Sequence, residues 1–210
     1  SASYPAGGID APVWTAGCPI VCGVGRQRLK VWDSKTAELL HTYAGHRGAI
    51  NAVAWSPGGE LLASASWDKT IRLWESASGT LRATLTEHQA PVFCVAWSPD
   101  GKLLVTGWTA AGTLSMVDVA TGRPTRVPPE ILKEELGGPA KNPRGVDAVR
   151  FTPDGRHFYG GGQRTGGLFF YNSADGKQAG GLSFEHFACG ALTADLSQMV
   201  WGTDDPGSDG

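Results

Sequence analysis

A block of sequence that recurs about every forty residues constrains this chain more than any other feature. Its most complete copy is residues 45–86. Trp32, Trp74 and Val117 mark equivalent positions, 42 and 43 residues apart, and Tyr171 follows after 54 residues. Repeats of this length form arrays in which each unit buries its apolar faces against its neighbours. The chain is therefore expected to be one repeat domain.

Within the complete copy, the apolar residues follow the pattern of short β-strands. Residues 50–55 alternate between two faces, residues 56–59 (Ser-Pro-Gly-Gly) break the run, and residues 61–66 begin a second alternation. This pattern predicts a hairpin. Two further strands are predicted at 71–74 and 80–85. Each unit should be a four-stranded antiparallel sheet in an all-β protein.

Short motifs in the complete copy are similar to those of a known family. Gly45-His46 opens the copy, residues 64–75 read Ser-Ala-Ser-Trp-Asp-Lys-Thr-Ile-Arg-Leu-Trp-Glu, and Trp32-Asp33 supplies a Trp-Asp dipeptide. These motifs resemble a repeat of the WD (tryptophan-aspartate) β-propeller family. The resemblance implies a toroid of four-stranded blades, with the first strand of each unit nearest a central channel. It also implies a scaffold for contacts with other proteins.

The repeats predict a single propeller domain over residues 1–210 with four complete units and part of a fifth. The approximate units are 7–44, 45–86, 87–126, 145–184 and an incomplete 185–210, with an insertion at 123–145. Propellers of this family usually have about seven blades. We therefore expect a segment of a larger propeller, and the alternatives are completion of the ring by a second chain and an unusually small closed ring.

The insertion has a helical pattern of its own. Pro128-Pro129-Glu130 precedes the apolar residues Ile131, Leu132 and Leu136, and two glycines follow. Proline near the first turn and glycine beyond the end are typical of a short helix. Such an element either folds onto its own blade or displays a contact surface beyond the propeller face.

The resemblance implies a buried, hydrogen-bonded tetrad in the second unit. Its members by motif are His46, Ser64 or Ser66, Asp68 and Trp74. A turn aspartate can accept from an imidazole, and the imidazole can connect through a hydroxyl to an indole. A His, Ser and Asp could also form a nucleophilic triad, but this stretch has no glycine elbow to expose the hydroxyl. We favour the structural interpretation.

The third and fourth units depart from this pattern. Val117 replaces the third-strand Trp in the third unit, and Thr165 and Tyr171 occupy the Asp and Trp positions in the fourth. Both units must depend on apolar packing, which predicts locally softer blades. In the fourth unit the packing residues are Phe151, Phe158, Leu168 and Phe170.

The resemblance also implies recognition residues at one rim of the channel, just before the turn aspartate and early in the first strand. Carried over by motif, the candidate protein-binding residues are Asn51, Trp67, Phe93, Trp108, Asp147, Arg164 and Asp204. Aromatic side chains near an arginine are typical of interface hot spots. The alternative for Trp67 is that its ring covers a neighbouring blade.

Composition narrows the class of partner. The net charge is −2 and no basic stripe is present, so binding to nucleic acid is not expected. No apolar run approaches a membrane span, and the first residues lack the pattern of a signal peptide. Together these observations predict a cytoplasmic protein that does not bind membranes.

No motif in the chain predicts chemistry. The sequence has no phosphate-binding loop and no metal-binding helix motif, and we expect no cofactor and no metal. We therefore expect a non-catalytic scaffold with one or more protein partners, including self-association if a second copy completes the ring. The alternatives are a propeller enzyme with a small ligand or metal in its channel, and a sensor propeller fused to an effector domain.

Overall fold

The computed structural model describes residues 9–13, 20–24, 27–33, 35–108, 114–126, 146, 148–162, 167–183, 189–192 and 199–202. Eighteen strands lie in these segments. They are β1 (Ile9–Val13), β2 (Ile20–Val24), β3 (Arg28–Trp32), β4 (Leu39–Ala44), β5 (Ile50–Trp55), β6 (Leu61–Ser66), β7 (Ile71–Glu75), β8 (Leu81–Leu85), β9 (Val92–Trp97), β10 (Leu103–Trp108), β11 (Leu114–Asp118), β12 (Pro124–Arg126), β13 (Ala148–Phe151), β14 (His157–Gly162), β15 (Gly167–Asn172), β16 (Gln178–Ser183), β17 (Cys189–Leu192) and β18 (Met199–Gly202).

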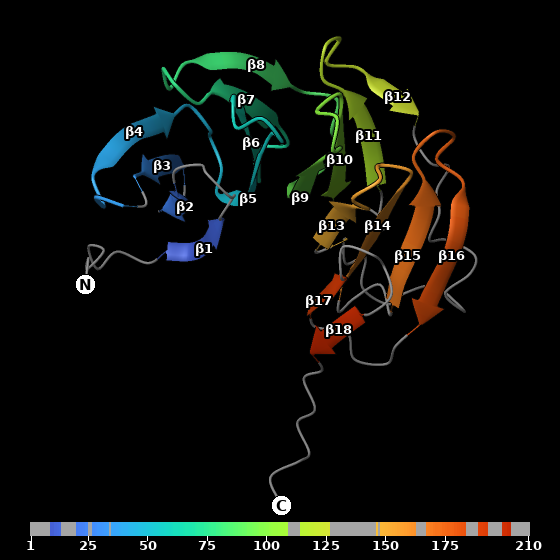
Figure 1. Cartoon of the computed structure of the whole chain (residues 1–210). Helices are drawn as coiled ribbons and strands as arrows, with labels where there is room; N and C mark the ends of the chain where they lie inside the picture. Colours follow the sequence, from blue (N-terminus) through green and yellow to red (C-terminus); the bar gives the residue numbers. More distant parts are fainter. Residues whose placement is uncertain are drawn as a thin grey trace, which may run out of the picture.

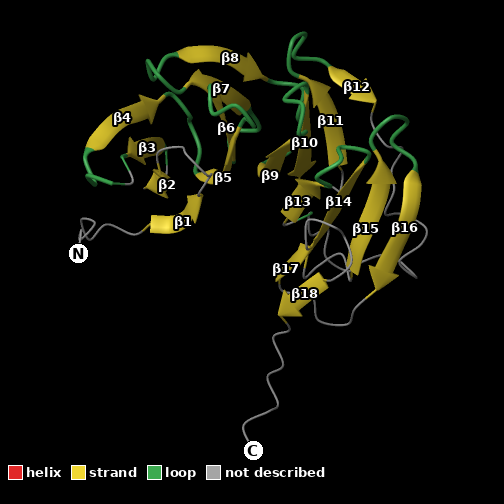
Figure 2. Ribbon diagram, viewed as in Figure 1, coloured by secondary structure: helices red, strands yellow, loops and turns green. Residues whose placement is uncertain are grey.

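Consecutive strands pair antiparallel in four four-stranded sheets, and β17 and β18 form a two-stranded sheet. We call the four larger sheets blades one to four, comprising β1–β4, β5–β8, β9–β12 and β13–β16. Figure 1 shows them side by side in an arc, with the later strands of each blade on the outside. Figure 2 shows strands joined by loops throughout the described segments. The predicted all-β fold of four-stranded propeller blades is confirmed.

Several local expectations can be compared with these strands. The pairing of β1 with β2 contains a register shift between Ile9 and Pro12. The short helix predicted within the insertion lies outside the described residues. No helix in the described part of the chain is both long and apolar enough to cross a bilayer.

A recurring hydroxyl explains why a Ser-Pro or Thr-Pro motif follows the first strand in blades two, three and four. The Oγ of Ser56 accepts a hydrogen bond from the N–H of Leu61 (3.0 Å), across the turn between β5 and β6. Ser98 and Thr152 make the same contact in blades three and four. The hydroxyl thereby supplies an acceptor for the first amide of the returning strand.

The core lies between adjacent blades. Strands β5 and β9 are neighbours on the inner side of the arc, and so are β9 and β13. Three apolar clusters fill the interfaces between blades one and two, two and three, and three and four. Trp97 adds a polar contact, because its indole N–H donates to the carbonyl of Ala54 in the neighbouring blade (2.9 Å). Blades one, two and three thus each bury one face against the blade that follows.

Candidate protein-binding rim and its buried network

A chain of hydrogen bonds connects the turn between β6 and β7 to the core of blade two. Nδ1 of His46 lies 2.9 Å from Oδ2 of Asp68, and Nε2 of the same ring lies 2.7 Å from Oγ of Ser64. The indole N–H of Trp74 donates to that Oγ (2.8 Å). The rings of His46 and Trp74 also meet edge to face. The four predicted tetrad positions therefore lie in one contiguous chain, with Ser64 as the serine in it.

The donors and acceptors in this chain constrain the form of the imidazole. The carboxylate of Asp68 can only accept, so Nδ1 of His46 carries a proton and donates. Ser64 accepts the indole N–H, and its own O–H can donate to an unprotonated Nε2. A neutral His46 with its proton on Nδ1 is consistent with all of these contacts. Burial lowers the pKa of His46, against the neighbouring Asp68, which raises it, and the net direction is downward.

Asp68 is the acceptor for the whole turn. Its carboxylate accepts hydrogen bonds from the backbone N–H of Arg47 (2.8 Å) and from both the N–H and the hydroxyl of Thr70 (3.0 and 2.6 Å). Burial by itself would raise the pKa of Asp68, but these donors and His46 outweigh it and bring the pKa down to about 2. The aspartate is thus ionised and ties two loops together.

Ser66, the alternative tetrad serine, has a different partner. Its side chain is buried, and its Oγ accepts from the backbone N–H of Asp68 at 3.1 Å. This contact closes the turn itself and does not link the imidazole to the indole. Ser64 and Ser66 point the same way on β6, because residues two apart share a face, yet only Ser64 lies within reach of Trp74.

The rim residue Trp67 is held by its backbone and exposes its side chain. Its N–H donates to the carbonyl of Ala49 (2.9 Å), and the next residue is the anchored Asp68. A Cβ added to Gly48 would lie 2.6 Å from the N of Asp68, so the glycine lets the loop before β5 close onto this turn. The side chain of Trp67 is 52% exposed. It is therefore an aromatic residue displayed on a fixed turn.

Phe93 and Asn51 lie beside this tryptophan. The rings of Trp67 and Phe93 meet edge to face, with centroids 5.4 Å apart. Phe93 is half-buried on β9, between the buried Val92 and Cys94, so its side chain leaves the core as its phase in the strand predicts. Nδ2 of Asn51 donates to the carbonyl of Val92 (2.8 Å). These three residues join blades two and three at one end of their first strands.

Trp108 has another position. Its ring meets that of His88 at 4.9 Å and nearly at right angles. Nε2 of His88 lies 3.1 Å from Oγ1 of Thr106, and its Nδ1 is buried with no partner among the described residues. Burial lowers the pKa of His88 to about 4. Trp108 thus covers a buried histidine of blade three.

The remaining rim candidates, Asp147, Arg164 and Asp204, lie outside the described residues. The structure also contains two polar residues that the motif analysis missed. Thr70 completes the aspartate turn, and Thr106 occupies the place in β10 that Ser64 has in β6. Aligning the fourth residue of these two strands would have identified Thr106, because a threonine hydroxyl has the same hydrogen-bonding capacity as a serine.

Among the described residues, no group of three or more His, Cys, Asp or Glu side chains is placed to hold a metal ion. The buried histidines have other partners. His46 contacts Asp68 and Ser64, and His88 contacts Thr106. In blade two, the hydroxyl nearest an imidazole is buried and already bonded to an indole, so it is not displayed as a nucleophile. The hydrogen bonds of His46, Ser64 and Trp74 therefore favour a structural role for this network over a catalytic one.

Comparison with known families identifies two repeats in this chain. Residues 37–75 and 79–118 each match the family model described as WD domain, G-beta repeat. The two matched stretches include β5–β7 of blade two and β9–β11 of blade three. The buried network and the Trp67–Phe93 contact both lie within them.

Individual relatives match over similar stretches. A periodic tryptophan protein 2 homolog of Schizosaccharomyces pombe is 42% identical over 55 residues, covering 25% of this chain and 6% of the relative. The guanine nucleotide-binding protein subunit beta-2 of Caenorhabditis elegans is 36% identical over 69 residues, 33% of this chain and 18% of the relative. The U5 small nuclear ribonucleoprotein 40 kDa protein of Dictyostelium discoideum is 39% identical over 52 residues, which cover 25% of this chain and 15% of the relative. The similarity thus spans a small part of each relative.

Proposed function

The chain belongs to the WD-repeat family, and we propose that it is a non-catalytic scaffold that binds another protein through the rim around Trp67 and Phe93. Proteins of this family are commonly interaction scaffolds and usually have no catalytic activity. The names of two relatives, a G-protein subunit and a ribonucleoprotein component, describe parts of larger assemblies. Membership in the WD-repeat family supports a scaffold function and does not identify the partner.

The observation that carries this proposal is the exposure of Trp67. Large aromatic side chains on monomeric surfaces are unusual, and tryptophan is among the residues most enriched in interface hot spots. Trp67 presents half of its surface, leans on Phe93, and follows a loop fixed by hydrogen bonds at Ala49 and Asp68. A side chain that is already ordered loses little conformational entropy when a partner covers it.

The other rim candidates have unequal support. Asn51 lies at the same end of blade two and has a fixed amide, so we keep it as a contact residue. Trp108 packs against His88, which favours a structural role. Asp147, Arg164 and Asp204 stay predictions of the motif alignment. A cytoplasmic location also stays a prediction, and one relative, the U5 small nuclear ribonucleoprotein 40 kDa protein, is named as part of a nuclear particle.

The test is affinity capture from source-cell lysate with the wild-type chain and with a Trp67→Ala, Phe93→Ala double variant. Circular dichroism must first show that the two chains are equally folded. A Lys102→Ala variant is the control, because Lys102 is 79% exposed in the turn between β9 and β10, away from this rim. We expect one or more proteins to be captured by the wild type and the control and lost with the double variant. Equal capture by all three chains would reject the rim.

A further inference from the structure

Three short segments of blades one and two meet at the rim that carries Trp67. They are residues 27–28, 44–50 and 67–70. The N–H of Trp67 donates to the carbonyl of Ala49 (2.9 Å), and Nε2 of Gln27 donates to the carbonyl of Arg47 (3.2 Å). The three segments therefore lie together at one end of the two blades.

The exposed charges of these three segments are all positive. They belong to Arg28, Arg47 and Lys69. The acidic residue of the segments is Asp68, whose side chain is 10% exposed. Its carboxylate accepts from the N–H of Arg47, from His46 and from the hydroxyl of Thr70. Its hydrogen-bonding capacity is therefore directed inward, while the cations face solvent.

Arg72 places a further cation against the loop that carries Arg47. Its guanidinium carbon lies 5.8 Å from the centroid of the Trp74 ring, and a Cβ added to Gly45 would clash with its Nη1. The buried Nε of Arg72 has no hydrogen-bond partner among the described residues. No described carboxylate forms an ion pair with this guanidinium. Arg72 thus adds positive charge beneath the rim.

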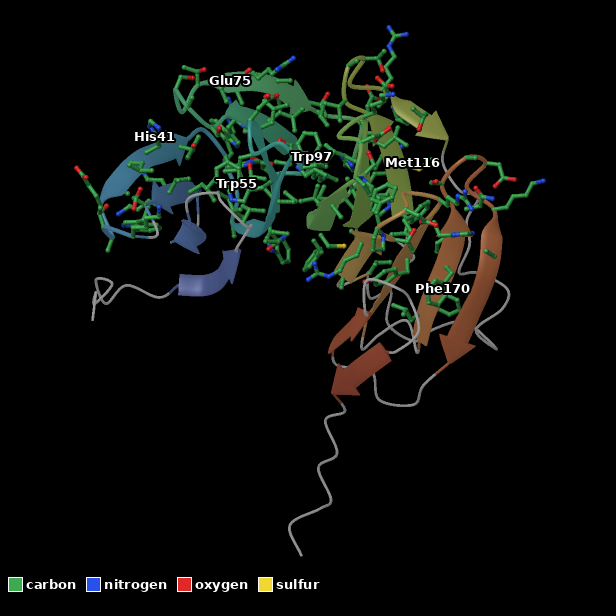
Figure 3. All side chains as sticks on the ribbon, viewed as in Figure 1. His41, Trp55, Glu75, Trp97, Met116 and Phe170 are labelled. Carbon is green, nitrogen blue, oxygen red and sulfur yellow. The ribbon has the colours of Figure 1, made fainter. Side chains whose placement is uncertain are left out.

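The neighbouring acidic residues leave an excess of positive charge here. Glu75 ends β7, at the opposite end of that strand from the Trp67 turn, and pairs with Arg82 at 3.2 Å (Figure 3). Glu87 is exposed in the loop before β9 and is the acidic residue of that loop. In the described part of the rim, four cations therefore stand against two carboxylates, Asp68 and Glu87.

Lys69 has a backbone conformation that is unfavourable for lysine. Its φ is +69°, in the left-handed region that favours glycine. Glycine has the turn positions with similar angles at Gly59, Gly79 and Gly101. Residues that persist in such conformations are concentrated at functional sites. A lysine at this position costs stability relative to glycine, which supports a functional role for its ammonium group.

We propose that the rim binds an acidic segment of another protein, in which an apolar side chain covers Trp67 and flanking carboxylates meet Arg47 and Lys69. This proposal rests on the rim being the protein-binding site. A Cβ added to Gly48, the residue after Arg47, would lie 3.0 Å from Cβ of Trp67, and Lys69 is two residues beyond Trp67. Both cations therefore begin within roughly 8 Å of Trp67. Complementary charge selects an acidic segment and disfavours a basic one.

The test selects binders from a phage-displayed library of random short peptides, with the full chain as bait. The selection is repeated with Trp67→Ala and with an Arg47→Gln, Lys69→Gly double variant, in which glycine suits the positive φ. The matched control is Lys35→Gln, Lys102→Gln. It removes the same charge from exposed turns at the other end of the strands. All chains are first compared by circular dichroism.

We expect the enriched peptides to combine several aspartates or glutamates with a large apolar residue, and to be lost with Trp67→Ala. A labelled synthetic copy of the most enriched peptide is then measured by fluorescence anisotropy. It should bind about tenfold more weakly to the Arg47→Gln, Lys69→Gly variant than to the wild type, and equally to the control and the wild type.

Two kinds of failure are distinguishable. Peptides that depend on Trp67 but have no excess of acidic residues, or equal binding to the wild type and the Arg47→Gln, Lys69→Gly variant, would overturn the acidic partner and leave the rim as a binding site. If no enriched peptide depends on Trp67, both the acidic partner and the rim are rejected.

Discussion

Blades two and three each bury a histidine at the same place, but they surround it differently. In blade two, His46 lies between Asp68 and Ser64, and the chain of hydrogen bonds ends at Trp74. In blade three, His88 keeps a hydroxyl partner, while Val117 stands where Trp74 would be. Both blades nevertheless have four strands. The blade itself therefore depends on apolar burial, and the complete network additionally fixes one turn.

That turn carries Trp67, the exposed aromatic of the rim. Asp68, its neighbour, accepts from two separate loops, so the position of Trp67 is coupled to the buried chain. Trp108 precedes the corresponding turn of blade three and packs on His88. Trp108 is the last residue of β10 and has the place of Ser66 at the end of β6, whereas Trp67 lies one residue beyond that strand. The comparison teaches that an aromatic residue at the strand end covers a core group, and one in the following turn is displayed.

The largest expected effect is that of Asp68→Ala. This change removes the acceptor for His46, the Arg47 amide and Thr70, and should lower the free energy of unfolding by roughly 3–4 kcal/mol. Asp100→Ala is the matched control, since Asp100 is a turn aspartate that is 57% exposed. Its cost should stay below about 1 kcal/mol. Both free energies are measured by urea unfolding. Equal losses for Asp68→Ala and Asp100→Ala would contradict a stabilising role for the buried network.

The next largest effect is expected in a pH titration of stability, which tests whether His88 is a buried neutral imidazole. Burial holds the pKa of His88 at about 4, so the unfolded chain binds more protons than the folded chain between pH 6.5 and 4. Stability from this group is complete above pH 6.5 and should decline by about 3 kcal/mol as the pH falls to 4. Asp68, with a pKa of about 2, loses its contribution only at lower pH.

The His88→Gln variant is the control for this titration, because glutamine can still bond to Thr106 but does not titrate. Urea unfolding of both chains at several pH values gives the slope of stability against pH. The variant should show a shallower decline than the wild type between pH 6.5 and 4. Parallel curves for the two chains would show that His88 is not a buried neutral imidazole.

Replacing the hydroxyls compares the two networks more finely. Ser64→Ala leaves both the imidazole of His46 and the indole of Trp74 without a partner, at a cost of about 2 kcal/mol. Thr106→Val leaves one imidazole nitrogen unpaired and keeps the side-chain shape, at about 1 kcal/mol. Thermal unfolding followed by circular dichroism gives the order. A larger loss of stability with Thr106→Val than with Ser64→Ala would contradict the conclusion that blade two has the more extensive network.

The smallest effect on stability should come from Trp67→Ala. Its ring is exposed and contacts Phe93 at an edge, so the loss should be about 0.5–1 kcal/mol. A loss as large as that of Asp68→Ala would indicate that Trp67 is mainly a packing residue that covers a neighbouring blade. The measurement is urea unfolding, with Phe93→Ala as a companion variant.

The sequence predicted the fold well because its signals are local and repeated. The strands were predicted from the period-two alternation in residues 50–55 and 61–66 and from the glycine turn between them. The blades were predicted from the regular spacing of Trp32 and Trp74. The Ser-Pro-Gly-Gly break at residues 56–59 marked the hairpin of blade two, and in the structure the hydroxyl of Ser56 accepts a hydrogen bond from the N–H of Leu61 on the next strand. These signals need no knowledge of distant contacts.

Other features required three dimensions. The choice between Ser64 and Ser66 depended on which hydroxyl reaches Trp74, and both serines lie on the same face of β6. The contact between Trp67 and Phe93 joins residues from two blades, which spacing alone could not bring together. Trp108 was aligned with Trp67 by motif, but strand pairing gives it the place of Ser66, because Trp108 pairs with Val92 as Ser66 pairs with Ile50. It therefore shares a strand face with Thr106, and its ring contacts His88.

The most direct measurement of partner binding at the rim is site-specific photo-crosslinking in source cells. A benzophenone amino acid is placed at position 67 and, as a control, at position 102, which is highly exposed in a turn between β9 and β10. We predict a discrete crosslinked adduct from position 67 that is absent from position 102, and loss of that adduct when Phe93 is also replaced by alanine. No adduct at position 67, or the same adducts at both positions, would contradict a binding site at Trp67.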